Sequence, residues 1–150
     1  MPNWCSNSVT ITGEKAKQFI TFLDRKRGKN FFDFFVPPAK DSDDNWYSYN
    51  HENYGCKWNC DANSWQKLDE ETVEVVFDSP WCPPLALFEK MFQDGWDVDA
   101  KYYEPGMCFV GHWYNGDDDV YEYADENVMD VVPEYLVEFW NLDEQEEFDD

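Results

Sequence analysis

Alternation of apolar and polar residues predicts several short strands along the chain. In 8–12, Val9 and Ile11 alternate with threonines, a period of two that is typical of half-buried strands. The same period recurs in three later segments: 57–62, 72–77 and 96–102. Residues 31–36 form a short aromatic run that ends at a Pro-Pro pair, and we interpret it as extended. The segments 57–62 and 72–77 are expected to pair antiparallel around a loop at 63–70.

Apolar residues at helical spacing predict three helices. The first covers 14–25 and is followed by Gly28 after a cationic last turn, which is the expected stop signal. The second begins at Pro83-Pro84, because proline is tolerated in the first helical turn, and ends before Gly95. The third begins near Pro133. Its predicted apolar face carries Val132, Tyr135, Leu136 and Phe139.

The remaining segments complete the predicted order of elements. Residues 108–114 and 120–123 flank Asn115-Gly116-Asp117, a turn signal for a hairpin. Residues 41–53 are expected to be an inserted loop with a single helical turn. The resulting α+β order matches a split β-α-β antiparallel sheet with helices on one face, plus an added β-hairpin and C-terminal helix. We predict one domain over 1–142 and an acidic tail at 143–150.

The charge of the chain is strongly negative and unevenly distributed. The 150 residues carry 33 acidic and 11 basic side chains, for a formal net charge of -22. Six of the basic residues lie before residue 30, and no Lys or Arg follows Lys101. Such a field repels nucleic acid and anionic membranes and speeds encounter with basic surfaces. We expect a basic protein as partner, although the charge has a simpler interpretation as a source of solubility.

Composition and cysteine usage narrow the class of protein. Hydrophobic residues make up 43% and aromatic residues 19%, so the chain has enough apolar material to fold despite its charge. No segment approaches the roughly 20 apolar residues of a membrane span, and 1–4 lacks the features of a signal peptide. Five scattered cysteines favour reduced, buried thiols over a disulfide framework. We expect a cytoplasmic protein.

The C-terminal part supplies the candidate partner-binding residues. Asp130, Glu134 and Glu138 recur every four residues and share one face of the predicted helix, where they could stand in for a row of phosphates. The acidic run 117–119 lacks the spaced ligands of a calcium loop, so we interpret it as a solvated hairpin tip. The candidate acidic surface consists of Asp117, Asp118, Asp119, Glu122, Asp130, Glu134 and Glu138.

Four motifs carry a resemblance to a known family. They lie in order along most of the chain: Pro2-Asn3-Trp4-Cys5-Ser6-Asn7, Tyr54-Gly55-Cys56-Lys57-Trp58, Phe77-Asp78-Ser79-Pro80-Trp81-Cys82-Pro83-Pro84, and Tyr103-Glu104-Pro105-Gly106 with Gly111. Together they resemble the YubB-type ferredoxin-like domain proteins. This sequence departs from the usual pattern at four positions, with Tyr54 for tryptophan, Cys56 for threonine, Pro80 for alanine and Cys82 for serine.

The resemblance implies a ferredoxin-like fold and a protein carried by bacteriophages, plasmids or their hosts. A phage-encoded protein of this kind would act in the host bacterial cytoplasm. The family has no established activity, so the resemblance lends no catalytic residue to this chain. The cysteines that replace small hydroxyl residues argue against a metal site.

Metal and catalytic motifs find little support in the sequence. Cys56 and Cys60 with His51 nearby are candidate zinc ligands, and a fourth could come from Cys5, Cys82 or His112. The spacing is not that of a C-x-x-C knuckle, so we favour buried thiols and expect no cofactor. No phosphate-binding loop, dinucleotide fingerprint or nucleophile elbow is present, and we expect no enzymatic activity.

A second candidate site mixes tryptophans with single polar groups. One interpretation is a ligand pocket with a rigid aromatic wall and a few directed polar groups. The other, which we favour, is structural, with tryptophans in the core, Lys57 paired with Asp78 or Glu104, and asparagines bonded to loop backbone. The set is Asn3, Trp4, Asn7, Lys57, Trp58, Asp78, Trp81 and Glu104.

Two functional hypotheses follow from these two surfaces. The first is a non-enzymatic phage or mobile-element protein that binds and inhibits a basic host protein, such as a nucleic-acid-binding or anti-phage defence protein, by imitating DNA. The second is a module that binds a small ligand or peptide in a tryptophan-lined pocket, with the acidic surface serving only solubility. The partner and the oligomeric state are left open by the sequence.

Overall fold

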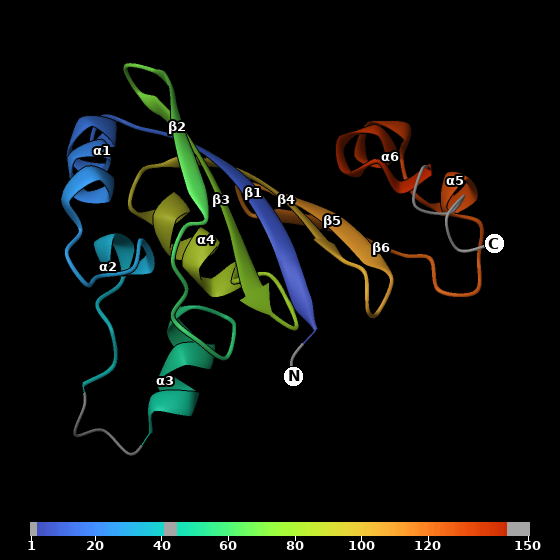
Figure 1. Cartoon of the computed structure of the whole chain (residues 1–150), viewed down its shortest axis with the longest axis horizontal. Helices are drawn as coiled ribbons and strands as arrows, with labels where there is room; N and C mark the ends of the chain where they lie inside the picture. The colour runs from blue at the N-terminus through green and yellow to red at the C-terminus, as the bar shows by residue number, and fades with distance from the viewer. Residues whose placement is uncertain (1–2, 41–44, 144–150) are drawn as a thin grey trace.

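The computed structural model describes residues 3–40 and 45–143 and is built around one antiparallel sheet (Figure 1). The sheet has six strands in the order β2-β3-β1-β4-β5-β6. The α+β class that we predicted is therefore confirmed. The strands are β1 (Trp4–Thr12), β2 (Ser64–Asp69), β3 (Thr72–Pro80), β4 (Asp97–Glu104), β5 (Phe109–Tyr114) and β6 (Asp117–Glu122).

Strand β1 lies in the middle of the sheet and pairs along its length with β3 on one edge and β4 on the other. Its side chains alternate strictly between buried and half-buried positions, because successive residues point to opposite faces of a strand. Cys5, Asn7, Val9 and Ile11 point to the buried face. The neighbouring strands present Val73, Val75 and Phe77, and Val98, Ala100 and Tyr102, to the same core.

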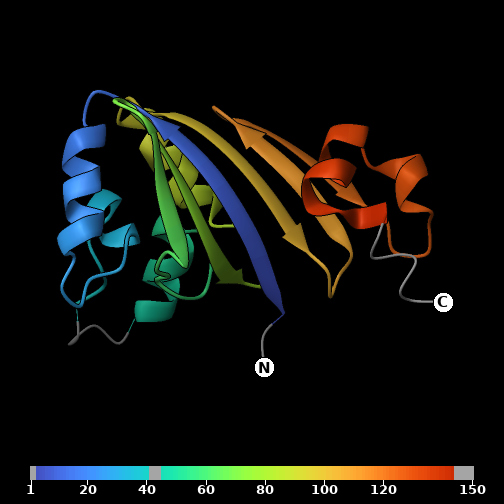
Figure 2. The same cartoon turned by 45° about the horizontal axis from the view of Figure 1, so that its top comes forward.

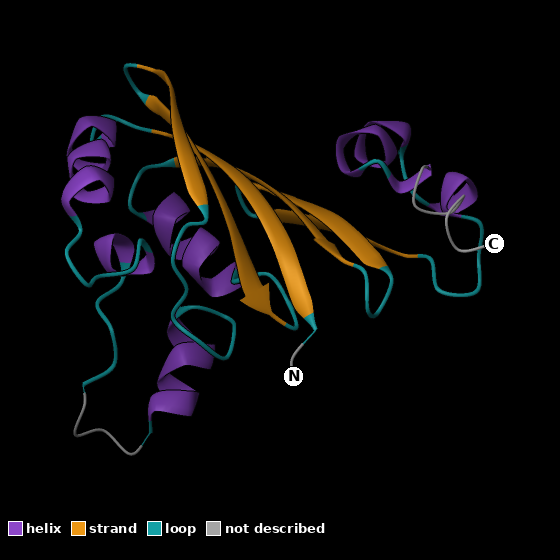
Figure 3. Cartoon of the chain, in the orientation of Figure 1, coloured by secondary structure: helices purple, strands orange, loops and turns teal. Residues whose placement is uncertain are grey.

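Four helices come before β4, β5 and β6 in the sequence, and they gather beside the buried face of the sheet (Figures 1 and 3). Helix α1 directs Ala16, Phe19 and Leu23 into the core, as its i, i+3, i+7 spacing requires. The Phe19 ring lies 4.9 Å from that of Phe35 and 6.1 Å from that of Trp96. The four helices are α1 (Ala16–Arg25), α2 (Phe32–Phe35), α3 (Trp46–Asn53) and α4 (Leu85–Gln93).

The C-terminal helices α5 (Val128–Val131) and α6 (Glu134–Trp140) lie on the opposite face of the sheet, over β5 (Figure 2). Val110 points to these helices, whereas Trp113, an odd number of residues away, packs on Phe88 of α4. The sheet therefore carries helices on both faces. Within 3–40 and 45–143, every helix is too short or too polar to cross a lipid bilayer.

The aromatic run 31–36 is helical, and our prediction of an extended segment is wrong. Helix α2 places Phe31, Phe32 and Phe35 in the core at spacings of one and four residues, which a strand would have divided between two faces. The Phe32 ring lies 5.1 Å from Tyr54 and 5.6 Å from Phe77. Packing of these rings decides the conformation, because the run itself has no clear period.

The partner strand of β3 was assigned to the wrong segment. Residues 57–62 form a loop, and β2 occupies 64–69, where we expected the loop. Strand β2 is a mostly exposed edge strand, so it carries few apolar side chains and no clear alternation. The alternation of Trp58, Cys60 and Ala62 comes from a loop whose side chains pack against the core.

Two further expectations need correction, and several elements agree with prediction. Residues 46–53 form α3 instead of loop with a single turn, while 41–44 lie outside the described residues. In α6 the buried side chains are Leu136 and Val137, whereas Tyr135 and Phe139 are exposed.

The structure confirms several predicted elements. They are the strands at 8–12, 72–77 and 96–102, the first two helices and the hairpin at 115–116. The predicted tail at 143–150 lies almost wholly outside the described residues.

Gly111 allows the Tyr102 ring to cross β5. A Cβ atom at residue 111 would lie 2.2 Å from Cζ of Tyr102. The Tyr102 side chain is 1% exposed and is bonded through its hydroxyl to Asp118.

We expect Gly111→Ala to lower the free energy of unfolding by about 1–3 kcal/mol in urea denaturation, because the packed ring must move. Val120→Thr, which keeps the β-branch at an exposed site opposite, should change it by less than about 0.5 kcal/mol. An unaltered Gly111→Ala midpoint would contradict this packing.

Candidate functional site

The seven predicted carboxylates are all exposed and lie at one end of the sheet (Figure 1). They belong to three consecutive elements, β6, α5 and α6, so our prediction that Asp130 shares one helix with Glu134 and Glu138 is wrong. We call this set the carboxylate surface: Asp117, Asp118, Asp119, Glu122, Asp130, Glu134 and Glu138. The structure therefore brings together, on neighbouring elements, residues that the sequence spreads over 22 positions.

Strand β6 divides its carboxylates between the two faces of the sheet. Asp118 opposes Trp113 and accepts a hydrogen bond from Tyr102, so it lies on the face of α4. Asp119 opposes His112, on the face of α6. Since side chains alternate along a strand, Asp117 shares a side with Asp119, and Glu122 shares a side with Asp118. Only Asp117 and Asp119 extend the acidic side chains of α5 and α6.

The run 117–119 is part of a strand, so our prediction of a hairpin tip is wrong. The turn is made by Asn115 and Gly116, which have φ angles of 45° and 101°. Two such left-handed residues match the twist of a tight hairpin. Asn115 also accepts a hydrogen bond from the backbone N–H of Val98 at 2.8 Å and donates one to Asp97 at 2.7 Å. These bonds fix the turn and leave 117–119 free to pair with β5.

The surroundings of Asp118 perturb its acidity. Partial burial raises the pKa of its carboxyl, the hydrogen bond from Tyr102 at 2.6 Å opposes that change, and the nearby Asp119 adds to it. Burial and the Asp118 carboxylate also raise the pKa of the Tyr102 phenol. The pair therefore keeps its proton on the phenol at neutral pH and ties β6 to β4.

The structure reveals a chain of hydrogen bonds that the sequence did not indicate. His112 lies between Asp99, with Nε2 2.6 Å from the carboxylate Oδ1, and Tyr135, with Nδ1 2.9 Å from the hydroxyl. A carboxylate only accepts hydrogen bonds, so Nε2 carries a proton, and with a neutral ring Nδ1 accepts from the Tyr135 hydroxyl. The three residues come from β4, β5 and α6, and no sequence motif joins them.

This chain fixes α6 to the sheet and does not activate the tyrosine. Burial, together with Tyr121, Asp119 and Asp99, raises the pKa of the Tyr135 phenol. A phenol of raised pKa stays protonated at neutral pH and is a poor nucleophile. Lys101 lies 3.5 Å from Asp99 and 5.1 Å from the Phe139 ring centroid, which adds a second contact between β4 and α6. These contacts orient α6 and its carboxylates.

Four thiols lie near the start of β1: those of Cys5, Cys56, Cys60 and Cys82. Hydrogen bonding between Cys56 and Cys60 and burial raise the pKa of the Cys56 thiol, and burial raises those of Cys5 and Cys82. The Cys56 and Cys60 thiols both donate to the Trp58 carbonyl, at 3.2 and 3.4 Å. A thiol of raised pKa is a poor nucleophile and a poor metal ligand.

The histidines considered as zinc ligands have other contacts. The His51 ring lies 4.4 Å from that of Tyr47, and His112 uses both ring nitrogens. Among residues 3–40 and 45–143, no three His, Cys, Asp or Glu side chains are arranged to hold a metal ion.

The eight residues of the second candidate site fall into two groups. The buried polar members bond to neighbouring groups: Asn7 donates to the Ser79 hydroxyl at 2.9 Å and to the Cys5 carbonyl at 3.1 Å, and Glu104 accepts from the backbone N–H groups of Gly106 and Met107. At the edge, the Asn3 carbonyl accepts from Trp81, and Asp78 accepts from Asn63. These contacts organise loops.

Trp4 and Trp81 are not core residues, contrary to the interpretation we favoured, whereas Trp58 is half-buried and packs against the core. Trp4 is 45% and Trp81 is 48% exposed, and the ring centroids of Trp4 and Trp58 lie 5.8 Å apart. We call Trp4, Trp58 and Trp81 the tryptophan surface. The Lys57 ammonium lies 5.2 Å from the Trp58 ring centroid, so it makes a cation–π contact instead of the predicted ion pair.

Trp81 has an unusual backbone. Its φ angle is 71°, in the left-handed region that bulky residues avoid, and its N–H donates to the Asn3 carbonyl at 2.7 Å. The strain holds an aromatic side chain in solvent. Strained residues of this kind cluster at functional sites.

Comparisons with known proteins give a distant structural match. No protein-family model matches the chain, and no curated protein sequence matches it. The crystal structure of protein api92 from Yersinia pseudotuberculosis, which carries the family description DUF1281, resembles the chain with a TM-score of 0.49 and 12% sequence identity. The match covers 83% of this chain and 99% of api92.

The strain at Trp81 can be tested with a pair of variants. We expect Trp81→Gly to be more stable than Trp81→Ala by about 1 kcal/mol in urea denaturation, because only glycine adopts positive φ without cost. At Trp4, which lies in the extended β1, the order should reverse, with Trp4→Ala the more stable by about 0.5–1 kcal/mol. The same order at both sites would mean that Trp81 is not strained.

Asp118 should make the protein less stable as the pH rises. Its raised pKa means that the folded state holds the proton more tightly than the unfolded state, so the free energy of unfolding falls as pH increases above about 4. Asp118→Asn should flatten this fall in denaturation curves recorded at several pH values. Asp117→Asn removes the same charge from the neighbouring exposed position and should leave the slope nearly unaltered. Equal slopes in all three proteins would contradict the assignment.

Proposed function

We propose that the protein is a non-enzymatic inhibitor that binds a basic protein through the carboxylate surface and imitates DNA in doing so. The observation that carries the proposal is the exposure of all seven carboxylates on adjoining elements, five of them on the side of the sheet where α5 and α6 lie. A desolvation cost is small for exposed carboxylates, so they remain charged and available to Lys and Arg side chains. The natural targets are nucleic-acid-binding proteins, including anti-phage defence proteins.

The separation of charge supports the same proposal. Helix α1 and the residues just after it carry the early basic residues and lie at one end of the long axis, while β6, α5 and α6 lie at the other end (Figure 1). A molecule polarised in this way is turned by the field of an approaching basic protein, so that its acidic end leads. The encounter is thereby both faster and oriented.

The spacing on α6 suits imitation of a phosphate row. Glu134 and Glu138 are four residues apart, a rise of about 6 Å along a helix. Two nucleotide steps along a DNA strand rise about 7 Å. Asp130 of α5 and Asp119 of β6 lie on the same side of the sheet and continue the acidic side chains beyond the helix. The bonds from Asp99 through His112 to Tyr135 hold this helix in place.

We also propose the ferredoxin-like arrangement and the YubB-type family for this chain. In favour of the arrangement, β1 lies between β3 and β4, and β2 lies outside β3, with α1 and α4 as the connections. Strands β5 and β6 would then be an addition to the four-strand unit. In favour of the family are the ordered motifs around Trp4, Trp58 and Trp81. Such a protein would act in the cytoplasm of a bacterial host of a phage or mobile element.

A second candidate function rests on the tryptophan surface. Exposed aromatic rings bind peptides and small ligands, and Trp4 and Trp81 are both nearly half exposed. On this proposal the acidic end of the molecule contributes solubility alone. The two candidates depend on different elements, with the carboxylates on β6, α5 and α6 and the tryptophans at the start of β1 and in nearby loops, so separate variants can distinguish them.

The first candidate is tested by capture from bacterial lysate with identification of the bound proteins. We expect nucleic-acid-binding proteins to be enriched, duplex DNA to compete with capture, and binding to weaken steeply between about 50 and 200 mM salt. The variant Asp130→Asn/Glu134→Gln/Glu138→Gln should weaken capture about tenfold or more, because it removes three charge-assisted contacts.

The control variant is Glu14→Gln/Glu52→Gln/Glu71→Gln, which neutralises three exposed carboxylates elsewhere and changes the net charge equally. It should retain capture within about twofold. Equal loss in both triple variants, or no competition by DNA, would overturn the proposal. Loss of binding in Trp4→Ala/Trp81→Ala, with the carboxylate variant unaffected, would assign the function to the tryptophan surface.

A further inference from the structure

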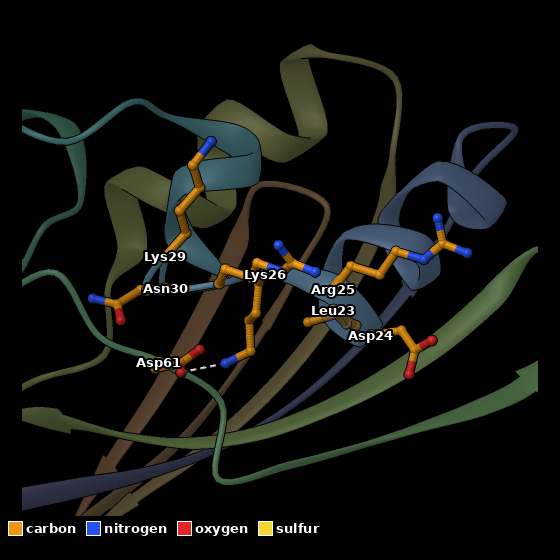
Figure 4. A pocket seen from close by; sticks show the side chains of 9 residues that line it. Leu23, Asp24, Arg25, Lys26, Lys29, Asn30 and Asp61 are labelled. Atoms are coloured by element: carbon orange, nitrogen blue, oxygen red, sulfur yellow. Dashed lines mark hydrogen bonds and ion pairs between the residues drawn. The ribbon is translucent and has the colours of Figure 1, made fainter.

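A hollow of about 870 Å³ opens at the C-terminal end of α1, and four of its nine lining residues are cations (Figure 4). Its lining runs from Leu23 to Asn30 and includes Asp61 of the neighbouring loop. It contains two carboxylates, Asp24 and Asp61, and four basic side chains, and Asp61 is paired with Lys26. We call these four the cationic groove: Arg25, Lys26, Arg27 and Lys29.

The wall of the hollow is fixed by hydrogen bonds. Asp61 forms an ion pair with Lys26 and accepts from the backbone N–H of Phe31 at 3.1 Å. Asn30 donates to the Asn59 carbonyl at 3.2 Å, and Asn59 donates to Asp33 at 2.6 Å. The turn that carries the cations is therefore held in place before any ligand arrives, which lowers the entropic cost of binding.

Three of the four cations are not neutralised by the protein. Asp61 is engaged with Lys26, while Arg25, Arg27 and Lys29 are exposed and have no carboxylate within 4 Å in the described part of the chain. Figure 4 shows Arg25 and Lys29 extending to either side of the Lys26–Asp61 pair. Arg25, in the last turn of α1, is accounted for by the helix dipole. That effect fades beyond the last turn, so it does not account for Arg27 and Lys29.

A second hollow, of about 330 Å³, adjoins the first and shares all four cations. Its additional lining is Thr21 and the half-buried ring of Phe22, which lies 5.4 Å from the Phe34 ring. A flat apolar wall beside a group of cations suits a ligand that joins a compact anion to a planar ring. A nucleotide has both parts.

The surrounding charge restricts the size of the anion. The chain has a net charge of -22, so an extended polyanion that reached beyond the groove would meet carboxylates. A compact anion is affected mainly by charges within the Debye length, about 8–10 Å at physiological salt. We propose that the cationic groove binds the phosphate groups of a mononucleotide, with its base against Phe22. This site is separate from the carboxylate surface and does not depend on it.

The test is calorimetric titration of the whole protein with adenosine 5′-diphosphate and, separately, with inorganic pyrophosphate. Adenosine 5′-diphosphate should bind the more tightly, since only it can contact Phe22. The variant Arg27→Gln/Lys29→Gln should weaken both about tenfold or more, because two charged donors are lost. Phe22→Leu should weaken adenosine 5′-diphosphate alone. Backbone amide NMR shifts should change at 25–30 and 59–61.

The matched control is Lys15→Gln/Lys17→Gln, which removes the same charge from exposed lysines at the start of α1. It should alter affinity by less than about twofold. Circular dichroism on each variant checks that it is folded. Equal weakening in both double variants, or no heat and no NMR shifts at about 10 mM ligand, would overturn the proposal. Tighter binding of a single-stranded oligonucleotide, or a groove-dependent dimer in sedimentation, would also overturn it.

Discussion

The double pairing of β1 is the interaction on which the rest of the structure depends. This strand supplies one row of the core through Cys5, Asn7, Val9 and Ile11, and it pairs both with the β2-β3 half of the sheet and with the β4-β5-β6 half. Its register sets which side chains of β3 and β4 reach the core, since a slip by one residue would turn every side chain to the other face. Both candidate surfaces are positioned by this register.

Some elements of this fold follow from the local sequence pattern, and others are decided by packing against distant elements. The strands around Val9, Val75 and Val98 were predictable because each has one buried and one wetter face, which imposes a period of two on the sequence. Residues 31–36 were not predictable, because phenylalanine fits a strand or a helix equally well and the choice is made by contacts with Tyr54 and Phe77. Edge strand β2 gave no period because it buries so little.

The candidate sites show the same division. Charge is a property of composition, so the exposure of the acidic residues from Asp117 to Glu138 could be anticipated from the sequence, whereas the burial of Glu104 could not. The division of β6 between two faces required the register with β5, in which Asp118 meets Trp113. The bonds of His112 required three elements to be placed in space. The exposure of Trp81 follows from one left-handed residue, which the amino-acid type argues against.

The two outer strands are protected against edge-to-edge association by different means. In β2 the pairing with β3 is irregular between Lys67 and Asp69. A bulge of this kind disrupts the regular row of backbone N–H and C=O groups with which another strand would pair. Strand β6 pairs regularly with β5, so its own edge relies on the repulsion of its carboxylates. That protection exists only while the carboxylates are ionised. Near the isoelectric point of about 4.1 this edge would become the most aggregation-prone part of the sheet.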